Sequence, residues 1–201
     1  MPWVPDTLTA PRRAALLIAA TVVLSLSACG GRKGGPEPSS VAQTAPSGGA
    51  TLLPRDAIIP LSAVREVLPE MSRETATGLD ETAVGDPAGT RSVTYATADG
   101  PQRVVISVDR YKSPEVASAA YQQAFQLSQQ VPGAKGEPVS GLGQRAFIGV
   151  ATQGNETHVG GGALDGDTIV TVTLQGYNGT NENKAKVSAI IRKQAAAKRA
   201  P

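Results

Sequence analysis

The single cysteine of this chain stands at the end of an apolar run near the amino terminus. The run extends from Ala14 to Ala28, about 15 residues, follows Arg12 and Arg13, and ends at Cys29. This length fits the apolar region of a signal peptide and falls short of the roughly 20 residues that a membrane-spanning helix needs. The arginines in front of the run predict that they stay in the cytoplasm and that the rest of the chain is exported. Because no second cysteine exists, the exported part must fold without a disulfide, on its hydrophobic core alone.

The residues Leu26, Ser27, Ala28 and Cys29 resemble the lipobox of bacterial lipoprotein signal peptides. In that family the cysteine thiol takes a diacylglycerol, a peptidase cuts just before the cysteine, and the new amino group is usually acylated. The resemblance implies that residues 1–28 are removed and that Cys29 is the lipid-attachment site. It places the protein on the outer face of the cytoplasmic membrane, exposed to the periplasm or cell wall. Two or three acyl chains, at ~0.8 kcal/mol per buried methylene, give stable anchoring.

Composition divides the remainder of the chain in two. Residues 29–55 are dominated by Gly, Pro, Ser, Ala and Thr, with few large apolar side chains before Leu52. Such a segment cannot bury enough surface to offset its chain entropy, which predicts a flexible tether. Residues 56–201 are sufficient for one domain with its own core. We expect this domain to be monomeric.

Charge is distributed unevenly along the exported part. Residues 50–183 hold nine basic and fifteen acidic side chains, whereas residues 184–201 hold six basic side chains and no acid. The basic end admits two interpretations: contact with anionic headgroups or an acidic partner, or a solvated helix whose cations complement its dipole. Export, tethering and the scarcity of aromatic residues argue against nucleic acid as a partner.

Apolar periodicity and turn residues predict the elements of the domain. Ser113 and Pro114 give the clearest helix start, and Pro132 and Gly133 stop that helix. Residues 72–90 are expected to be a loop. The expected elements are a helix over 62–68, a hairpin of strands 91–98 and 103–111, the helix after Ser113, strands 146–152, 157–164 and 168–175, and a helix over 181–198. The sequence therefore predicts an α+β fold in the order α-β-β-α-β-β-β-α, with an antiparallel sheet of about five strands and helices on one face.

Three short segments carry a family resemblance: Leu61–Leu68, Ser113-Pro114-Glu115 with Ala117, and Gly141–Phe147. Together they resemble the small actinobacterial envelope lipoproteins with a DUF3558-like domain and the related sensor-type domains of mycobacterial exported proteins. The chain lacks the paired cysteines common in those families. The resemblance implies an exported α+β domain, and those families share no established activity that could be transferred.

Several residue types that can carry chemistry occur in patterns that do not support it. His158 is the only histidine and lies in an expected strand without a nucleophile motif nearby. Asp165-Gly166-Asp167 lacks the downstream oxygen ligands of a calcium loop and instead predicts a hairpin turn. Glu66, Glu70 and Glu74 are spaced by four, but Pro69 should break the helix that would align them. We therefore expect no catalytic residues, no metal site, no cofactor and no enzymatic activity.

Export, tethering and the absence of catalytic motifs favour a ligand- or protein-binding, sensor-like module of the cell envelope. An accessory or structural subunit of a membrane complex is the alternative, and a lipid carrier is a further one that would need a large apolar cavity. Locally, Gly141 or Gly143 is expected to adopt a positive φ, and Phe147 to belong to the core rather than to a binding surface.

Overall fold

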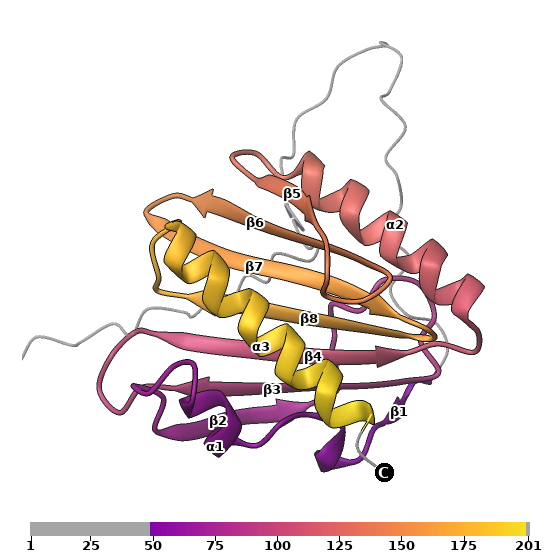
Figure 1. The fold of residues 1–201 in the computed structure, drawn as a ribbon, viewed down its shortest axis with the longest axis horizontal. Helices are drawn as coiled ribbons and strands as arrows, with labels where there is room; N and C mark the ends of the chain where they lie inside the picture. Colours follow the sequence, from indigo (N-terminus) through magenta and orange to yellow (C-terminus); the bar gives the residue numbers. More distant parts are fainter. Residues whose placement is uncertain (1–48, 200–201) are drawn as a thin grey trace, which may run out of the picture.

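A computed structural model describes residues 49–199 and shows one large sheet with helices on both of its faces (Figure 1). The expected signal peptide, Cys29 and most of the expected tether lie outside these residues. The sheet has eight strands in the order β1-β3-β4-β8-β7-β6-β5, with β2 also paired to β3. The strands are β1 (Thr51–Leu52), β2 (Arg73–Gly78), β3 (Gly89–Ala96), β4 (Arg103–Arg110), β5 (Lys135–Val139), β6 (Arg145–Gln153), β7 (Glu156–Asp165) and β8 (Thr168–Gln175).

The five strands expected from the sequence form the middle of this sheet, and they pair with one another in antiparallel fashion. Three further strands make the prediction of about five strands wrong. β2 lies in the stretch 72–90 expected to be a loop, β5 joins the opposite edge, and the two-residue β1 pairs parallel to β3 within the range expected to be tether. These three strands are mostly exposed, so they lack the alternating apolar residues by which a half-buried strand is recognised in a sequence.

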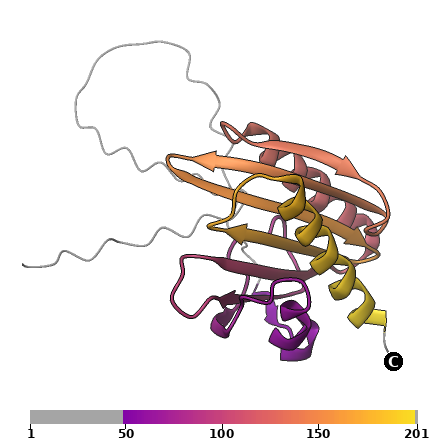
Figure 2. The same ribbon diagram turned by 60° about the vertical axis from the view of Figure 1, so that its left-hand side comes forward.

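The helices do not share one face of the sheet, so that expectation is also wrong. α3 (Asn181–Arg199) buries Val187, Ile190 and Ile191 against one face. α2 (Pro114–Gln130) packs on the other, where Ala117, Ala120 and Tyr121 meet Phe147, Leu164 and Ile169. Figures 1 and 2 show the two helices on opposite sides of the strands.

The helices cover both faces because several strands carry two consecutive apolar residues, one on each face of the sheet. Phe147 and Ile148 in β6, and Ile169 and Val170 in β8, are all buried although they point to opposite faces. A strand that is apolar on both sides must be covered on both sides. The apolar pattern of these strands therefore requires two covering layers.

The helix ends differ in how well the sequence specified them. α2 begins as expected: Ser113 is its N-cap, its hydroxyl accepts a hydrogen bond from the Val116 backbone N–H, and Pro114 occupies the first position. Val116 itself is exposed rather than part of the apolar face. α1 (Leu61–Arg65) begins directly after Pro60 and ends at Arg65, so it is shorter than the helix expected over 62–68.

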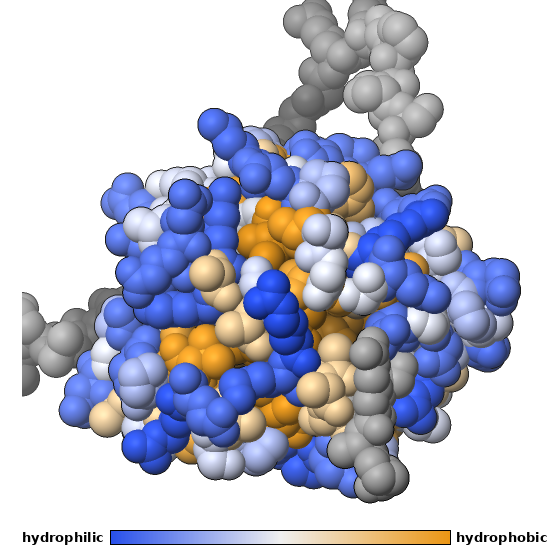
Figure 3. All heavy atoms as spheres, in the orientation of Figure 1, coloured by the Kyte–Doolittle hydropathy of each residue, from blue (hydrophilic) through white to orange (hydrophobic). Residues whose placement is uncertain are grey.

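The face that carries α3 is only partly covered by it. In Figure 3 polar side chains of the helix run between two areas of apolar surface. Half-buried apolar side chains packed against this core include Leu61, Ala63, Val67, Val139 and Val150. This face is therefore closed by α1 and by the β5–β6 turn as well as by α3.

Candidate functional site

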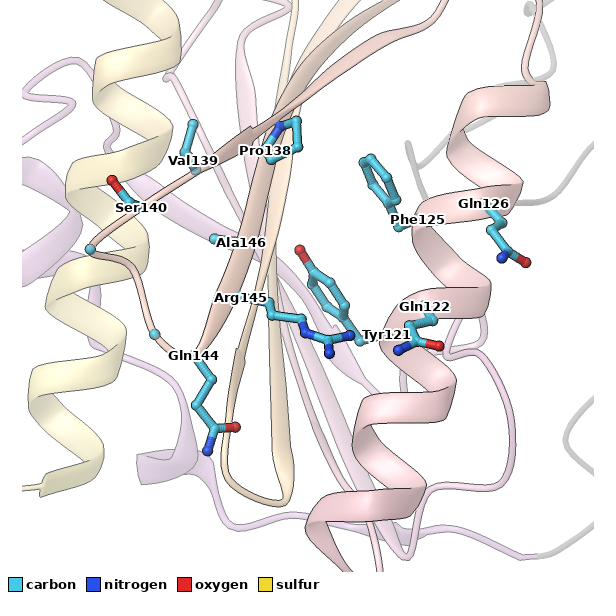
Figure 4. Close-up of a pocket in the computed structure, with 12 residues that line it drawn as sticks. Tyr121, Gln122, Phe125, Gln126, Pro138, Val139, Ser140, Gln144, Arg145 and Ala146 are labelled. Carbon is cyan, nitrogen blue, oxygen red and sulfur yellow. The ribbon is translucent and has the colours of Figure 1, made fainter.

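A groove of about 490 Å³ lies between α2 and the turn that joins β5 to β6 (Figure 4). Phe125 on α2 and Pro138 on β5 face each other across it, and Arg145 lies beside Tyr121 and Gln122. Helix α2 contributes one wall and residues 138–146 the other. The lining residues are Tyr121, Gln122, Phe125, Gln126, Pro138, Val139, Ser140, Gly141, Gly143, Gln144, Arg145 and Ala146.

An aromatic cluster lies beneath the groove. The ring of Phe147 lies 5.3 Å from that of Phe125 and 6.0 Å from that of Tyr121, centroid to centroid, with the planes tilted by 52° and 56°. Gly162 on β7 makes room for Phe147, since a Cβ at that position would stand 3.0 Å from the Phe147 ring. Tilted aromatic pairs of this kind contribute ~0.5–1.5 kcal/mol beyond their burial. Phe147 is only 7% exposed, so its expected burial in the core is confirmed.

The turn of the groove wall has the expected backbone. Gly141 has φ 76° and Gly143 φ 133°, which confirms the expectation of a positive φ there. At Gly143 a Cβ would also lie 2.5 Å from the Leu164 carbonyl oxygen. Between the two glycines, Leu142 points into the core that faces α3. The turn is thus fixed both by its glycines and by an apolar anchor.

The rim of the groove is polar and carries a positive charge. Gln122, Gln126 and Gln144 supply amides, and Arg145 supplies a guanidinium at the first residue of β6. Burial raises the pKa of Tyr121 to about 12, and the nearby charge of Arg145 acts in the opposite direction. The arrangement can hold an apolar group on its floor and polar groups at its rim, the usual composition of a small-molecule site.

The residues singled out in the sequence do not form a second site. His158 is buried in β7, its ring nitrogens make no hydrogen bond within residues 49–199, and its nearest ion-pair partner is Glu156 at 3.7 Å. Burial lowers the pKa of His158, while Glu156 acts to raise it. Asp165 ends β7 and pairs with Thr168, so the expected hairpin turn is confirmed. No hydroxyl nucleophile is held against the imidazole in the described part of the chain.

The three glutamates spaced by four residues are separated by the fold, as Pro69 led us to expect. Glu66 pairs with Lys193, Glu70 accepts a 2.6 Å hydrogen bond from the Tyr177 hydroxyl, and Glu74 pairs with Arg55 at 2.6 Å. Each carboxylate thus has a separate structural partner. Among residues 49–199 no group of three His, Cys, Asp or Glu side chains could hold a metal ion.

The basic carboxyl-terminal helix uses most of its described cations within the protein. Besides Lys193, which pairs with Glu66, Lys186 pairs with Glu182 at 2.9 Å and Lys184 lies 3.9 Å from Glu137. Exposed pairs of this kind contribute little to stability. They do reduce the positive charge that α3 can offer to a headgroup or an acidic partner.

A buried carboxylate that the sequence did not single out lies on the α2 face of β4. Asp109 is 4% exposed and accepts a 2.6 Å hydrogen bond from the Thr90 hydroxyl. Burial raises the pKa of Asp109 well above its usual range, the charge of Asp80 acts in the same direction, and the Thr90 bond opposes them. Asp80 belongs to the segment after β2 that packs over this end of the sheet, where Tyr111 also bonds to the Val84 carbonyl.

Replacing Asp109 by asparagine is expected to stabilise the fold at neutral pH. A carboxyl whose pKa is raised on folding binds its proton more tightly in the folded state, so stability falls as pH rises above the ordinary value near 4. Asparagine keeps an acceptor for Thr90 without the desolvated charge. We expect Asp109→Asn to raise the free energy of unfolding at pH 7, because the unfolded state no longer gains from ionising a carboxyl that burial holds protonated in the folded state.

Urea denaturation at pH 7 and pH 4 measures this effect, with Asp99→Asn in the exposed β3–β4 turn as the control. The gain should shrink at pH 4, where Asp109 is protonated in the folded state and about half protonated in the unfolded state. A loss of stability at pH 7 would show instead that the fold requires the charged carboxylate.

None of the helices within residues 49–199 combines the length and apolar character needed to cross a membrane. The fold and the groove thus define a small α+β domain with helices on both faces of a mostly antiparallel sheet. No family model and no curated protein sequence matches the chain.

The fold is shared with a solved structure. The extracellular domain of PknH from Mycobacterium tuberculosis superposes with a TM-score of 0.50 at 12% identity, covering 70% of this chain and 93% of that one. A GTP binding regulator from Thermotoga maritima gives a TM-score of 0.39 at 16% identity, with 70% and 92% covered. The first likeness shows a fold shared with a mycobacterial extracellular domain. No match supports the narrower DUF3558-like assignment.

Proposed function

We propose that this chain is an exported lipoprotein whose domain binds a ligand in the groove between α2 and the β5–β6 turn. The groove itself is the main support, because it combines an aromatic floor with convergent polar side chains at the rim. The fold shared with the PknH extracellular domain adds weight to a location outside the cytoplasm. In this proposal the protein binds its ligand without transforming it, as the scattered positions of His158 and the glutamates suggest.

The proposed anchor fits this role. Lipid on Cys29 holds the chain at the membrane, and the segment between Cys29 and β1 allows the domain to stand away from the surface. In a lipid carrier, by contrast, acyl chains would need an enclosed apolar cavity, whereas this groove has three glutamines and an arginine along its rim. We therefore favour a small, partly polar ligand over a lipid.

Two neighbouring glutamines of α2 allow the groove to be tested with a matched pair of variants. Gln122 and Gln123 are both exposed on α2, but only Gln122 lines the groove. A tryptophan at position 122 should fill part of the groove, whereas one at position 123 points elsewhere. The probe is a mixture of water-soluble fluorinated aromatic fragments, and their binding is followed by fluorine NMR with the full chain held in lipid nanodiscs.

We expect Gln122→Trp to weaken the fragments that bind the unmodified chain by about tenfold or more, and Gln123→Trp to leave them unchanged. Empty nanodiscs correct for partition into lipid, and equal thermal midpoints of the two variants show that both are folded. Fragments that bind equally to all three proteins, or no binding at all, would contradict a ligand site in this groove.

A further inference from the structure

The charges around the groove indicate what kind of ligand it accepts. Of the twelve residues that line it, Arg145 alone is charged, and no carboxylate is among them. The domain as a whole is close to neutral, since residues 50–201 hold fifteen basic and fifteen acidic side chains. A groove whose one lining charge is positive favours an anion over a cation.

Arg145 has no ion-pair partner within residues 49–199, a property that it shares with other exposed cations such as Arg65, Arg73 and Arg110. By contrast, ion pairs are formed by Arg55, Lys184, Lys186 and Lys193. Glu137, two residues before the turn, is directed toward Lys184 at the opposite face of the sheet. The guanidinium therefore remains available for a group that enters the groove, and its fork of donors suits a carboxylate or a similar oxyanion.

The surroundings of Arg145 add two further requirements. Tyr121 and Phe125 present aromatic surface beside it, and both contact the buried ring of Phe147. Gln122, Gln126 and Gln144 offer amides, which donate and accept hydrogen bonds without adding charge. A single guanidinium next to an apolar floor matches one anionic group on an apolar body, and is too little charge for a polyanion.

Building on the proposed ligand-binding role, we propose that the groove binds small organic anions. The apolar or aromatic body of such a ligand packs on Tyr121 and Phe125, and its one oxyanion group pairs with Arg145. The glutamines bond to whatever polar atoms lie between these two ends. In this proposal Arg145 selects for a negatively charged ligand, and Tyr121 and Phe125 provide the affinity for its apolar body.

Two probes of the same shape, one charged and one neutral, show whether the groove prefers an anionic ligand. N-acetylphenylalanine carries a carboxylate, and N-acetylphenylalaninamide is the same molecule with a neutral amide in its place. Saturation-transfer NMR with the full chain in lipid nanodiscs gives the affinity of each. We expect the unmodified chain to bind the acid at least about tenfold more tightly than the amide, which corresponds to one charge-assisted contact.

Three variants then test whether Arg145 causes the preference for the acid over the amide. Arg145→Gln should reduce the affinity for the acid to that for the amide and leave the amide unaffected. Arg145→Lys should keep part of the preference, because it retains the charge without the planar fork. Arg192→Gln removes an exposed cation from α3 on the opposite face and should behave as the unmodified chain.

The outcomes distinguish this inference from the proposed function on which it rests. Equal binding of acid and amide, both abolished by Gln122→Trp, would overturn the anion preference and leave the groove as a ligand site. An acid preference that survives Arg145→Gln would also overturn it. If neither probe binds and the fluorinated fragments do not bind either, both the preference and the groove function are refuted.

Discussion

Replacing Phe147 by alanine is expected to lower the free energy of unfolding by ~3–5 kcal/mol. Phe147 is 7% exposed, packs against Tyr121 and Phe125, and fills the space above Gly162. Alanine would leave a cavity that the β6–β7 pair cannot close, because the backbone at Gly161 and Gly162 is fixed by pairing with both neighbouring strands. Chemical denaturation monitored by circular dichroism measures the loss.

Phe125→Ala is the matched control, because Phe125 is the other phenylalanine of the cluster and is only half-buried. Its replacement should cost clearly less stability and act mainly on binding, since Phe125 lines the groove and Phe147 does not. A larger loss of stability for Phe125→Ala than for Phe147→Ala would contradict the assignment of Phe147 to the scaffold and Phe125 to binding. If Phe147→Ala left stability intact but weakened binding, Phe147 would be a ligand contact instead of part of the scaffold.

The elements that the sequence predicted correctly are those whose ends are encoded locally. α2 has its cap and its proline in the first turn, and β8 begins directly after a glycine turn at Gly166 with φ 64°. β3 and β4 carry alternating apolar residues, and they pair along their whole lengths. In each case a short stretch of sequence contains the physical cause of the structure, so no distant contact is needed to infer it.

β5 could not be inferred in this way. Gly136 and Pro138 both disfavour a strand, yet residues 135–139 pair with β6 at the sheet edge. Proline is tolerated there because an edge strand has one side without a partner strand, and Gly136 is held by a hydrogen bond from the Gln129 side chain to its carbonyl. These contacts join residues that the sequence alone does not bring together.

The candidate site was hidden for the same reason. Its two walls are α2 and residues 138–146, and they form a groove only once β5 is placed beside β6. The sequence did single out the Gly141–Phe147 segment and predicted its turn geometry. What it lacked was the position of α2 on the face opposite α3, which follows from burial of the central strands on both sides.

The location of the domain depends on the proposed anchor at Cys29. Cys29 is the only cysteine in the chain, so Cys29→Ala should abolish incorporation of alkyne-tagged palmitate completely and leave the protein released from the membrane or mis-sorted. Loss of two or three acyl chains removes tens of methylenes from the bilayer, far more than any surface contact could replace. In-gel fluorescence of labelled cells and fractionation of their membranes measure the two effects.

Ser27→Ala is the matched control for the anchor, because it changes the residue two positions before Cys29 to another small one and keeps the thiol. It should be labelled and retained like the unmodified chain, which separates loss of the thiol from general damage to the signal segment. The anchored domain should also keep its groove accessible, since the segment after Cys29 is rich in glycine, proline and serine. A Cys29→Ala protein that still takes up fatty acid and remains in the membrane fraction would show that the lipobox interpretation is wrong and that another feature of the chain holds it there.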